Sequence, residues 1–527
     1  MSVKSTLTEA AGVHETASSL ADSLRQYIEA QYHILDEGLV RERRALLKAN
    51  ETIAQTPYVE STPVYKVGTP YDDLQIPQAA SDVLTKLSVM GLGLYPLPYE
   101  HQSQALTSFL GEEAADLVVA TGTGSGKTES FLMPVIGKLA VEAVERPESA
   151  ALPGCRAMLL YPMNALVNDQ LARIRRILGN PEAAKLLLNG RKTPIRFGSY
   201  TGRTPYPGKR SSTRDEQFIK PLFEEFYKKV AKIPAIQKDL ARIGRWPSKD
   251  LVAFYADDAV ETKTYASGKK VGNQFVSKNW KGRLLTQPGD RELMTRHEMQ
   301  TRCPELLVTN YSMLEYMLMR PIERGIFEQT RDWLKEDIRN EFILVLDEAH
   351  MYRGAGGAEV ALLIRRLCAR LEIPRERMRC ILTSASLGAG ETAVADGERF
   401  ARDLTGLLEG SSRKVRVIQG TNEQRSSVHT VTREQIDALA GFDLDAFQEA
   451  ANDLPSAQKA AVALAEQLGW GAPQADNHSS FRDWLFRSLT DFGPLEKLIT
   501  LVSGKAIKPR TLSQTLFEGC SLETTKK

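Results

Sequence analysis

Residues 121–128 read Thr-Gly-Thr-Gly-Ser-Gly-Lys-Thr and lie between an apolar run, 117–120, and a helix-like run, 129–144. A strand, a glycine loop, a lysine and a helix form the arrangement that holds a nucleoside triphosphate. Glycines let the backbone approach phosphate closely, and the helix N-terminus adds a positive potential. This segment therefore predicts a phosphate-binding loop at the edge of a parallel sheet.

The loop assigns a role to each of its polar residues. Lys127 is expected to reach the β- and γ-phosphates of ATP, and Thr128 is expected to offer its hydroxyl to Mg²⁺. The strict pattern has glycine six residues before the lysine, where this chain has Thr121, so the loop alone leaves open an ordinary glycine-rich turn. The predicted ATP-binding residues of the loop are Thr121, Gly122, Thr123, Gly124, Ser125, Gly126, Lys127 and Thr128.

A second segment, residues 342–350, places two carboxylates after a run of five apolar residues. Such a run predicts a buried strand, and ligands bind at the carboxyl ends of parallel strands. Asp347 is expected to hold Mg²⁺ together with Thr128, and Glu348 to orient and deprotonate the attacking water. Adjacent carboxylates repel each other unless a cation shares the site. We expect the two segments to lie side by side around ATP and Mg²⁺.

Further blocks follow in the order found in superfamily 2 DEAD/DEAH-box helicases, and the chain resembles them over roughly residues 97–390. The run 347–350 is Asp-Glu-Ala-His, and 384–386, Ser-Ala-Ser, resembles the coupling motif. Residues 97–102 resemble the adenine-reading motif. The resemblance implies that Gln102 contacts the base, that Lys127, Asp347, Glu348 and His350 are catalytic, and that His350 links the carboxylates to Ser384 and Ser386.

Three other blocks resemble the strand-gripping motifs of the superfamily: 161–166 with 169–170, then 200–202, then 308–311. Contacts of this kind go to phosphate and sugar, so movement along the strand is expected to ignore base sequence. The resemblance implies that nucleic acid is bound by Pro162, Asn164, Thr201, Gly202, Thr309 and Asn310.

A narrower resemblance is carried by residues 309–318 and 347–354. These runs are similar to the branch that holds the mitomycin-repair helicases and the large helicases of the DISARM and Druantia phage-defence systems. Membership of this branch implies a motor that moves on DNA in defence or repair. An RNA helicase, and a nucleotide-dependent clamp or scaffold that does not hydrolyse ATP, remain open alternatives.

Alternation of strand-like and helix-like runs predicts an α/β fold, with one RecA-like P-loop lobe over residues 97–425. The expected strands are 116–120, 156–161, 195–199, 305–309, 342–346, 379–383 and 414–418. Residues 1–96 are expected to form an N-terminal accessory segment, and 426–527 a mostly helical C-terminal one. Residues 203–300 form a basic insertion with 20 Lys and Arg against 12 Asp and Glu.

The insertion has two interpretations. Its basic residues and interleaved aromatics suit phosphates and unpaired bases. Alternatively, the aromatics fill a small core within the insertion. The aromatics concerned are Tyr206, Phe226, Tyr227, Trp246, Tyr255, Tyr265, Phe275 and Trp280.

The Gln-x-x-Gly-Arg-like run that marks a second RecA-like lobe does not follow Ser386. Related motors place ATP between two lobes, and the second donates an arginine to the γ-phosphate. We therefore expect the N-terminal part of a larger helicase or a split subunit, with the second lobe supplied in trans or in a longer native chain.

Bulk properties restrict the class of protein. Hydrophobic residues make up 42% of the chain and charged residues 25%, as in globular proteins. No apolar run approaches 18 residues and no secretory signal is visible, so no membrane is expected. Five widely separated cysteines suit a reducing compartment and give no zinc ribbon. These features predict a cytoplasmic protein.

Overall fold

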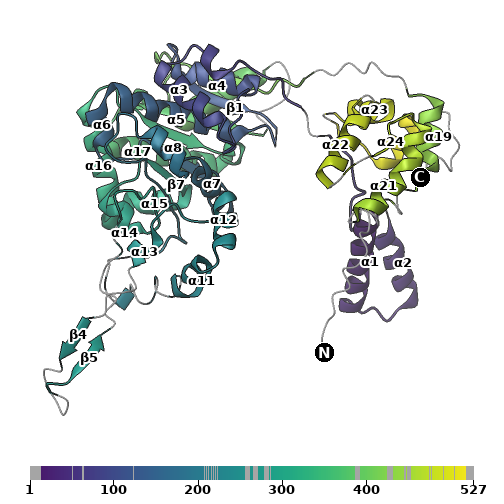
Figure 1. Ribbon diagram of the computed structural model, residues 1–527, viewed down its shortest axis with the longest axis horizontal. Helices are drawn as coiled ribbons and strands as arrows, with labels where there is room; N and C mark the ends of the chain where they lie inside the picture. Colours follow the sequence, from purple (N-terminus) through teal and green to yellow (C-terminus); the bar gives the residue numbers. More distant parts are fainter. Residues whose placement is uncertain are drawn as a thin grey trace. The chain divides into compact units, whose positions relative to one another are not determined.

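A computed structural model gives the structure of the chain, which forms two compact units (Figure 1). One unit is residues 65–421, and the other combines residues 1–64 with 422–527. The structure describes residues 13–49, 52–61, 64–122, 124–206, 208, 211, 213–214, 217, 219, 221, 223–255, 261–264, 271–277, 284, 286–385, 392–423, 431–443, 447, 453–473, 475, 478–490, 492–503 and 505–517.

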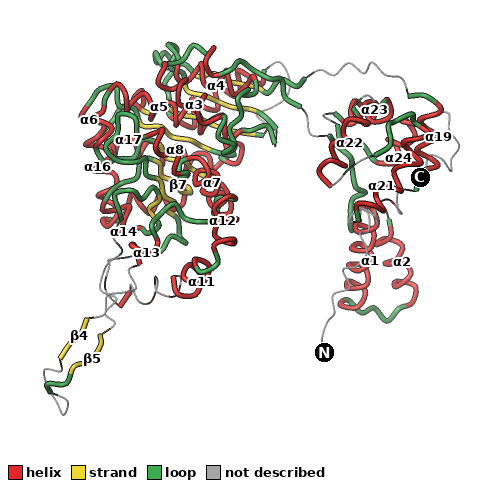
Figure 2. The backbone as a smooth tube through the Cα atoms, viewed as in Figure 1, coloured by secondary structure: helices red, strands yellow, loops and turns green. Residues whose placement is uncertain are grey.

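The larger unit is built on one parallel sheet with the strand order β10-β1-β9-β8-β2-β7-β3-β6. Figure 2 shows strands of this unit in yellow among its helices in red. Its strands are β1 (Asp116–Ala120), β2 (Ala157–Tyr161), β3 (Phe197–Tyr200), β6 (Glu292–Leu293), β7 (Leu306–Asn310), β8 (Phe342–Leu346), β9 (Met378–Ser384) and β10 (Val415–Gln419). The predicted α/β class with a parallel sheet is confirmed.

One detail of the arrangement differs from expectation. Strand β9 lies between β1, which leads into the P-loop, and β8, which leads into the acidic pair, so the two strands are not neighbours. Strand order depends on which crossovers the whole chain makes, and no local pattern specifies it. The short strand β6 also went unpredicted, because two residues carry no periodicity.

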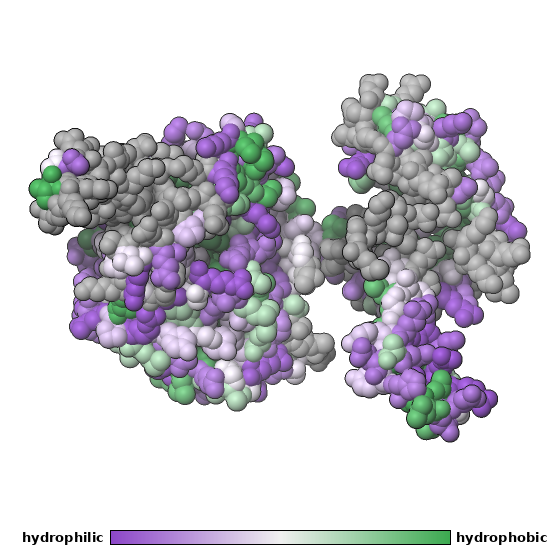
Figure 3. Space-filling view, turned by 90° about the horizontal axis from the view of Figure 1, so that it is seen from below, coloured by the Kyte–Doolittle hydropathy of each residue, from purple (hydrophilic) through white to green (hydrophobic). Residues whose placement is uncertain are grey.

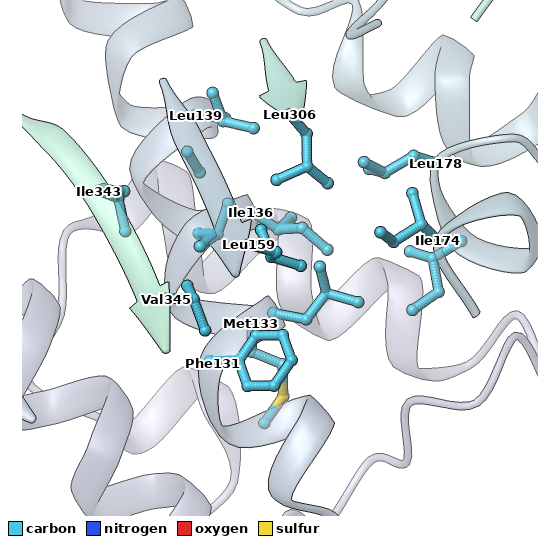
Figure 4. Close-up of a cluster of buried hydrophobic side chains, with 14 of the residues drawn as sticks. Phe131, Met133, Ile136, Leu139, Leu159, Ile174, Leu178, Leu306, Ile343 and Val345 are labelled. Carbon is cyan, nitrogen blue, oxygen red and sulfur yellow. The ribbon is translucent and has the colours of Figure 1, made fainter. Parts of the chain in front are cut away.

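Helices cover both faces of the sheet, and alternate strand residues supply the two cores. Leu159 and Val345 belong to one core, whereas Leu160 and Leu346 belong to the other. Figure 4 shows the first core, in which Phe131 and Ile136 of α5 meet the strands. The first face carries α3 (Gln78–Ser88), α4 (Glu100–Leu110), α5 (Lys127–Glu145), α7 (Asn164–Ile177) and α8 (Pro181–Leu187); the second carries α14 (Arg296–Thr301), α15 (Tyr311–Met319), α16 (Arg324–Glu336), α17 (Gly354–Leu371) and α18 (Ala393–Thr405).

The insertion has a small apolar cluster of its own. It holds Tyr206, Phe223 and Phe254, with Tyr227 packed against it. Tyr206 and Tyr227 are therefore used inside the insertion, which favours the core interpretation for these two. Phe226 is 45% exposed. The side chains of Tyr255, Tyr265, Phe275 and Trp280 lie outside the described residues. The described elements are α11 (Lys228–Ala231), α12 (Pro234–Arg242), α13 (Leu251–Tyr255) and the hairpin β4 (Glu261–Thr264) and β5 (Gln274–Ser277).

The smaller unit is mostly helical in the residues that the structure describes. Its elements are α1 (Val13–Gln31), α2 (Glu37–Lys48), α19 (Arg433–Gly441), α21 (Leu454–Gln467), α22 (His478–Leu489), α23 (Gly493–Val502) and α24 (Pro509–Leu516). Residues 65–96, which we assigned to the N-terminal segment, lie instead in the unit that holds the sheet, because Leu84 and Leu87 are buried in its first core. The functional division of the chain remains a prediction.

Hydrophilic and hydrophobic residues are intermixed on the described surface (Figure 3). Such scattered apolar exposure is usual for globular proteins. No helix within the described ranges is long and apolar enough to cross a bilayer.

Candidate nucleotide site and nucleic-acid edge

The P-loop connects β1 to α5, and its glycines are required by the backbone. Gly124 and Gly126 have φ of 78° and 74°, in the left-handed region that favours glycine. A Cβ at Gly126 would also lie 2.4 Å from the Gln102 amide nitrogen. The positive φ therefore favours glycine at position 126, and a larger residue would also displace the Gln102 side chain. Thr123 lies outside the described residues.

Thr121 explains how the loop tolerates its departure from the strict pattern. Its φ is not positive, so the position does not need glycine. Its hydroxyl lies 2.6 Å from that of Ser125, and its amide donates to the Ser384 carbonyl at 3.1 Å. The contact between the two hydroxyls thus connects the start of the loop to Ser125, and the backbone contact connects it to β9.

The residues expected to read adenine hold the loop from outside. The Gln102 amide nitrogen donates to the Gly126 carbonyl at 3.0 Å, and its oxygen accepts from the Tyr99 amide at 3.0 Å. The His101 Nε2 atom lies 2.9 Å from the Ser125 carbonyl oxygen, and burial lowers the pKa of His101. Both polar atoms of Gln102 are engaged by protein, and its contact to a base stays a prediction.

Lys127 is buried at the start of α5 and has an unusual environment. Its side chain is 11% exposed, and its ammonium nitrogen has no hydrogen-bond partner among the described residues. The Glu348 carboxylate lies 3.6 Å away. A buried ammonium is costly without acceptors, and phosphate oxygens are strong ones. The surroundings of Lys127 therefore fit a triphosphate.

Asp347 follows β8 and is held by a residue of the intervening strand. Thr383 donates its hydroxyl to Asp347. Burial raises the pKa of Asp347, the Glu348 charge raises it further, and the Thr383 hydrogen bond opposes both. A buried carboxylate with a raised pKa is stabilised in its charged form by a cation. Together with the Thr128 hydroxyl it offers the hard oxygen ligands that Mg²⁺ prefers.

The acidic turn brings three predicted residues together. Glu348 has φ 51° and ψ 46°, a left-handed conformation that costs a non-glycine residue on the order of 1–3 kcal/mol. One Glu348 carboxylate oxygen lies 3.3 Å from the His350 Nδ1 atom, which lies 3.4 Å from the Ser384 hydroxyl. His350 thus sits between Glu348 and Ser384. Ser386 lies outside the described residues.

The candidate nucleic-acid residues follow the next three strands of the same edge. The Asn310 side-chain nitrogen (Nδ2) donates to the Asn164 side-chain oxygen (Oδ1) at 2.6 Å. Thr309 is fully buried and its hydroxyl donates to the Tyr200 carbonyl at 2.6 Å, so this hydroxyl is used within the protein. A Cβ on Gly202 would meet nothing within 4 Å, which leaves open space beside the backbone.

Thr201 and Pro162 complete this group. The Thr201 hydroxyl accepts from the Arg203 amide at 3.2 Å, and Pro162 is partly exposed. The edge therefore has two halves. Nucleotide candidates follow β1, β9 and β8, and nucleic-acid candidates follow β2, β7 and β3.

Sequence reasoning missed three residues of the site. Thr383 orients Asp347, and the Tyr65 hydroxyl accepts from the Gly122 amide at 3.1 Å. The Gln170 amide donates to the Thr128 hydroxyl at 3.2 Å. Gln170 lies in the first segment that resembles a strand-gripping motif, but the sequence assigned it no role. Tyr65, a single tyrosine in a proline-punctuated stretch, has no sequence signal.

In the part of the chain that the structure describes, no group of three or more His, Cys, Asp or Glu side chains could hold a metal. The described cysteines, Cys155, Cys303, Cys368 and Cys380, form no disulfide. A metal at this edge would therefore depend on Thr128, Asp347 and phosphate together.

Comparison with known proteins identifies the domain. Residues 99–202 match the DEAD/DEAH box helicase family. The chain therefore carries a DEAD/DEAH-box helicase domain, as its motifs predicted. Over 514 residues, 98% of this chain, it is 68% identical to Druantia protein DruE of Escherichia coli. The predicted resemblance to the Druantia branch is thus confirmed.

Other similarities are more distant. An uncharacterized ATP-dependent helicase of Methanocaldococcus jannaschii is 28% identical over 114 residues, 22% of this chain. The chain spans 28% of the length of DruE and 15% of the archaeal protein. Among solved structures, the DUF1998 helicase MrfA bound to DNA has TM-score 0.35 and 16% identity, covering 82% of this chain and 44% of that one. Mycobacterium smegmatis helicase Lhr bound to ssDNA and AMP-PNP has TM-score 0.37 and 15% identity, covering 80% and 41%.

Proposed function

We propose that this chain is the ATP-binding motor lobe of a DNA helicase or translocase. The observation that supports this most directly is the Lys127 ammonium, which is buried beside Glu348 without a hydrogen-bond acceptor in the described residues. Glu348 balances the charge of this ammonium at 3.6 Å, and phosphate oxygens would accept the hydrogen bonds that it can still donate.

The chain's own residues would divide the work of ATP hydrolysis. The P-loop amides and Lys127 bind phosphate oxygens, and Thr128 and Asp347 hold Mg²⁺. Mg²⁺ neutralises charge on the phosphates when it is bound. Glu348 orients the attacking water and takes its proton, and His350 fixes the Glu348 carboxylate from the opposite side. Thr383 keeps Asp347 facing the site.

We assign nucleic acid to the second half of the sheet edge, at the ends of β2, β7 and β3. DNA is favoured over RNA because residues 309–318 and 347–354 resemble a branch of DNA motors. Backbone amides and small polar side chains at this edge suit phosphate and sugar rather than bases. Movement on DNA would then be independent of sequence, in phage defence or DNA repair, inside the cytoplasm.

A basic groove extends the proposed DNA surface. It has a volume of about 1500 Å³ and lies between the second half of α7 and the insertion. Seven Lys and Arg residues line it against four Asp residues. Arg173, which also contacts Glu129, and Arg176 line it from α7, and Lys238 and Arg242 line it from α12. The groove lies toward the end of α7 that is far from Asn164, so its cations would bind phosphates of DNA that extends beyond the strand-gripping edge.

Full activity would need a second RecA-like lobe, in a longer native chain or in trans. The Glu348 side chain is 24% exposed, so the reacting face of the site is open to a partner surface. An arginine from a second lobe raises hydrolysis by about 10³–10⁵ in related enzymes. Alone, the chain should bind ATP weakly, hydrolyse it slowly and leave duplex DNA intact.

The test is ATP hydrolysis with and without single-stranded DNA, for this chain alone and with a second lobe present. Stimulation by DNA supports the motor. Glu348→Gln should keep ATP binding and abolish hydrolysis, whereas the matched change Glu359→Gln, at an exposed position of α17, should leave both unchanged. Absence of stimulation in every combination would favour a nucleotide-dependent clamp or scaffold. Stronger stimulation by a matched RNA strand would favour an RNA helicase.

A further inference from the structure

We propose that Gln170 is a positioning residue that couples the nucleic-acid half of the sheet edge to Thr128 through helix α7. This proposal rests on the function proposed above and assigns its internal communication. It follows from three hydrogen bonds, connected through the chain at 309–310 and through helix α7, that lead from β3 to Thr128.

The first link joins β3 to β7. The Thr309 hydroxyl donates to the Tyr200 carbonyl at 2.6 Å, and both residues are fully buried. Tyr200 directly precedes Thr201, one of the candidate strand contacts. A displacement of the 201–202 turn would therefore also move Thr309 at the end of β7.

The second link joins β7 to α7. The Asn310 amide nitrogen donates to the Asn164 oxygen at 2.6 Å, while the Asn310 oxygen accepts from the Met313 amide at 2.7 Å and caps α15. Both ends of the Asn310 amide are thus fixed. Asn164 is the first residue of α7, so this bond holds the helix at its start.

The third link joins α7 to the P-loop helix. Gln170 is 7% exposed, and its amide donates to the Thr128 hydroxyl at 3.2 Å. Gln170 lies six positions after Asn164 in the helix, a rise of about 9 Å along its axis. Val167 and Leu171 bury the intervening turn against the sheet. A segment this short and well packed moves as one body.

The last bond affects chemistry because it reaches a proposed metal ligand. A hydroxyl has one proton and two lone pairs. When one lone pair accepts a hydrogen bond from Gln170, the direction of the other lone pair is restricted. Gln170 would thereby set the orientation of Thr128 toward Mg²⁺. A second contact, Arg173 with Glu129 at 3.3 Å, also joins α7 to α5 but does not touch the metal ligand.

Coupling between two ligands is reciprocal, which makes the relay measurable without hydrolysis. The experiment measures binding of a fluorescent oligo-dT strand to the full chain, with and without saturating AMP-PNP and Mg²⁺. Wild type should show a change in Kd of at least about 5-fold, within the usual range of such coupling. AMP-PNP affinity should change by the same factor when DNA is added.

Gln170→Leu keeps the side-chain size and removes the hydrogen-bond donor. The ratio of the DNA Kd values without and with AMP-PNP should fall below about 2-fold, while the melting temperature stays at the wild-type value. Asn164→Ala breaks the relay at the other end of α7 and should also reduce the ratio. Asn168→Ala, an exposed amide on the same helix, should leave it unchanged. A wild-type ratio in either relay variant overturns the relay and leaves the motor proposal intact. Equal Kd values with and without nucleotide in wild type also overturn the relay, whereas the motor proposal is tested separately by DNA-stimulated hydrolysis with a second lobe present.

Discussion

The Lys127 ammonium nitrogen lies 3.6 Å from a Glu348 carboxylate oxygen, although their strands are separated in the sheet by β9. Glu348 turns toward this position with a left-handed backbone, φ 51°, at the end of β8. The pair defines the space in which the proposed phosphates lie. Triphosphate oxygens would replace Glu348 as the partner of Lys127 and free the carboxylate to face water.

Lys127→Ala should weaken nucleotide binding by about 10-fold or more and abolish hydrolysis. A hydrogen bond to a charged group is worth roughly 1.5–3 kcal/mol, and the variant loses at least one. Titration with a fluorescent ATP analogue checks the binding. Lys335→Ala, on the exposed surface of α16, serves as the control. Unchanged affinity in Lys127→Ala would remove the phosphate assignment.

Nucleotide binding that depends on Mg²⁺ should strengthen as pH rises. Burial raises the pKa of Asp347, so at low pH a bound proton competes with the cation. Thr383→Val removes the hydrogen bond that lowers this pKa and should move the pH midpoint of binding upward. Affinity of the ATP analogue, measured across pH at constant Mg²⁺, gives both midpoints. Identical midpoints would mean that Asp347 does not bind the metal.

Lys238→Ala and Arg242→Ala should each reduce the salt dependence of DNA binding. A cation that touches phosphate contributes about 0.7 to the slope of log K against log salt for single strands. The double variant should therefore lose roughly 1.4. Lys335→Ala lies outside the groove and should keep the wild-type slope. If the double variant also keeps it, the groove does not contact DNA.

Glu341→Gln should lower the free energy of unfolding by about 3–5 kcal/mol, because the buried Arg379 and the partly buried Lys138 and Arg413 lose their shared carboxylate. Glu341 lies 2.8 Å from Lys138, 2.7 Å from Arg413 and 3.3 Å from Arg379. Burial opposes ionisation, but Lys138 and Arg379 lower the pKa of Glu341 to about 2. The stabilisation is thus complete above the model-peptide pKa of about 4.3 and declines as pH falls toward 2.

Urea denaturation at pH 7 and at low pH checks this prediction. The difference between wild type and Glu341→Gln should be largest at pH 7 and should shrink in acid. A difference that is the same at both pH values would show that the charge of Glu341 is not what stabilises the fold. Glu359→Gln, on the exposed surface of α17, should match wild type throughout.

The strands were predictable because their signals are local. Residues 342–346 are all apolar and form β8 with those bounds, since a strand buried on both faces needs an apolar residue at every position. The P-loop was predictable for the same reason. Its backbone turns through left-handed conformations that glycine adopts at little cost, and Gly124 and Gly126 stand at those positions.

The partners of polar side chains were not predictable. The resemblance gives Gln102 a base contact, which stays a prediction, but it does not indicate the hydrogen bond to the Gly126 carbonyl. No motif indicates that the Thr383 hydroxyl donates to Asp347. Tyr65 reaches the Gly122 amide from outside the helicase motifs. These bonds join residues far apart in the chain, and they depend on strand order and on rotamers that packing selects.

The amino-acid sequence by itself determined that this chain folds around a parallel sheet, carries a DEAD/DEAH-box phosphate loop and places an acidic pair at a strand end. Apolar periodicity and the backbone freedom of glycine act over a few residues, so local sequence patterns are enough to predict their effects. Only the tertiary structure decided that β9 separates the two strands, that the Lys127 ammonium lies 3.6 Å from Glu348, and that hydrogen bonds from α7 reach both halves of the edge. Those facts arise from the order in which distant segments pack, which no short pattern contains.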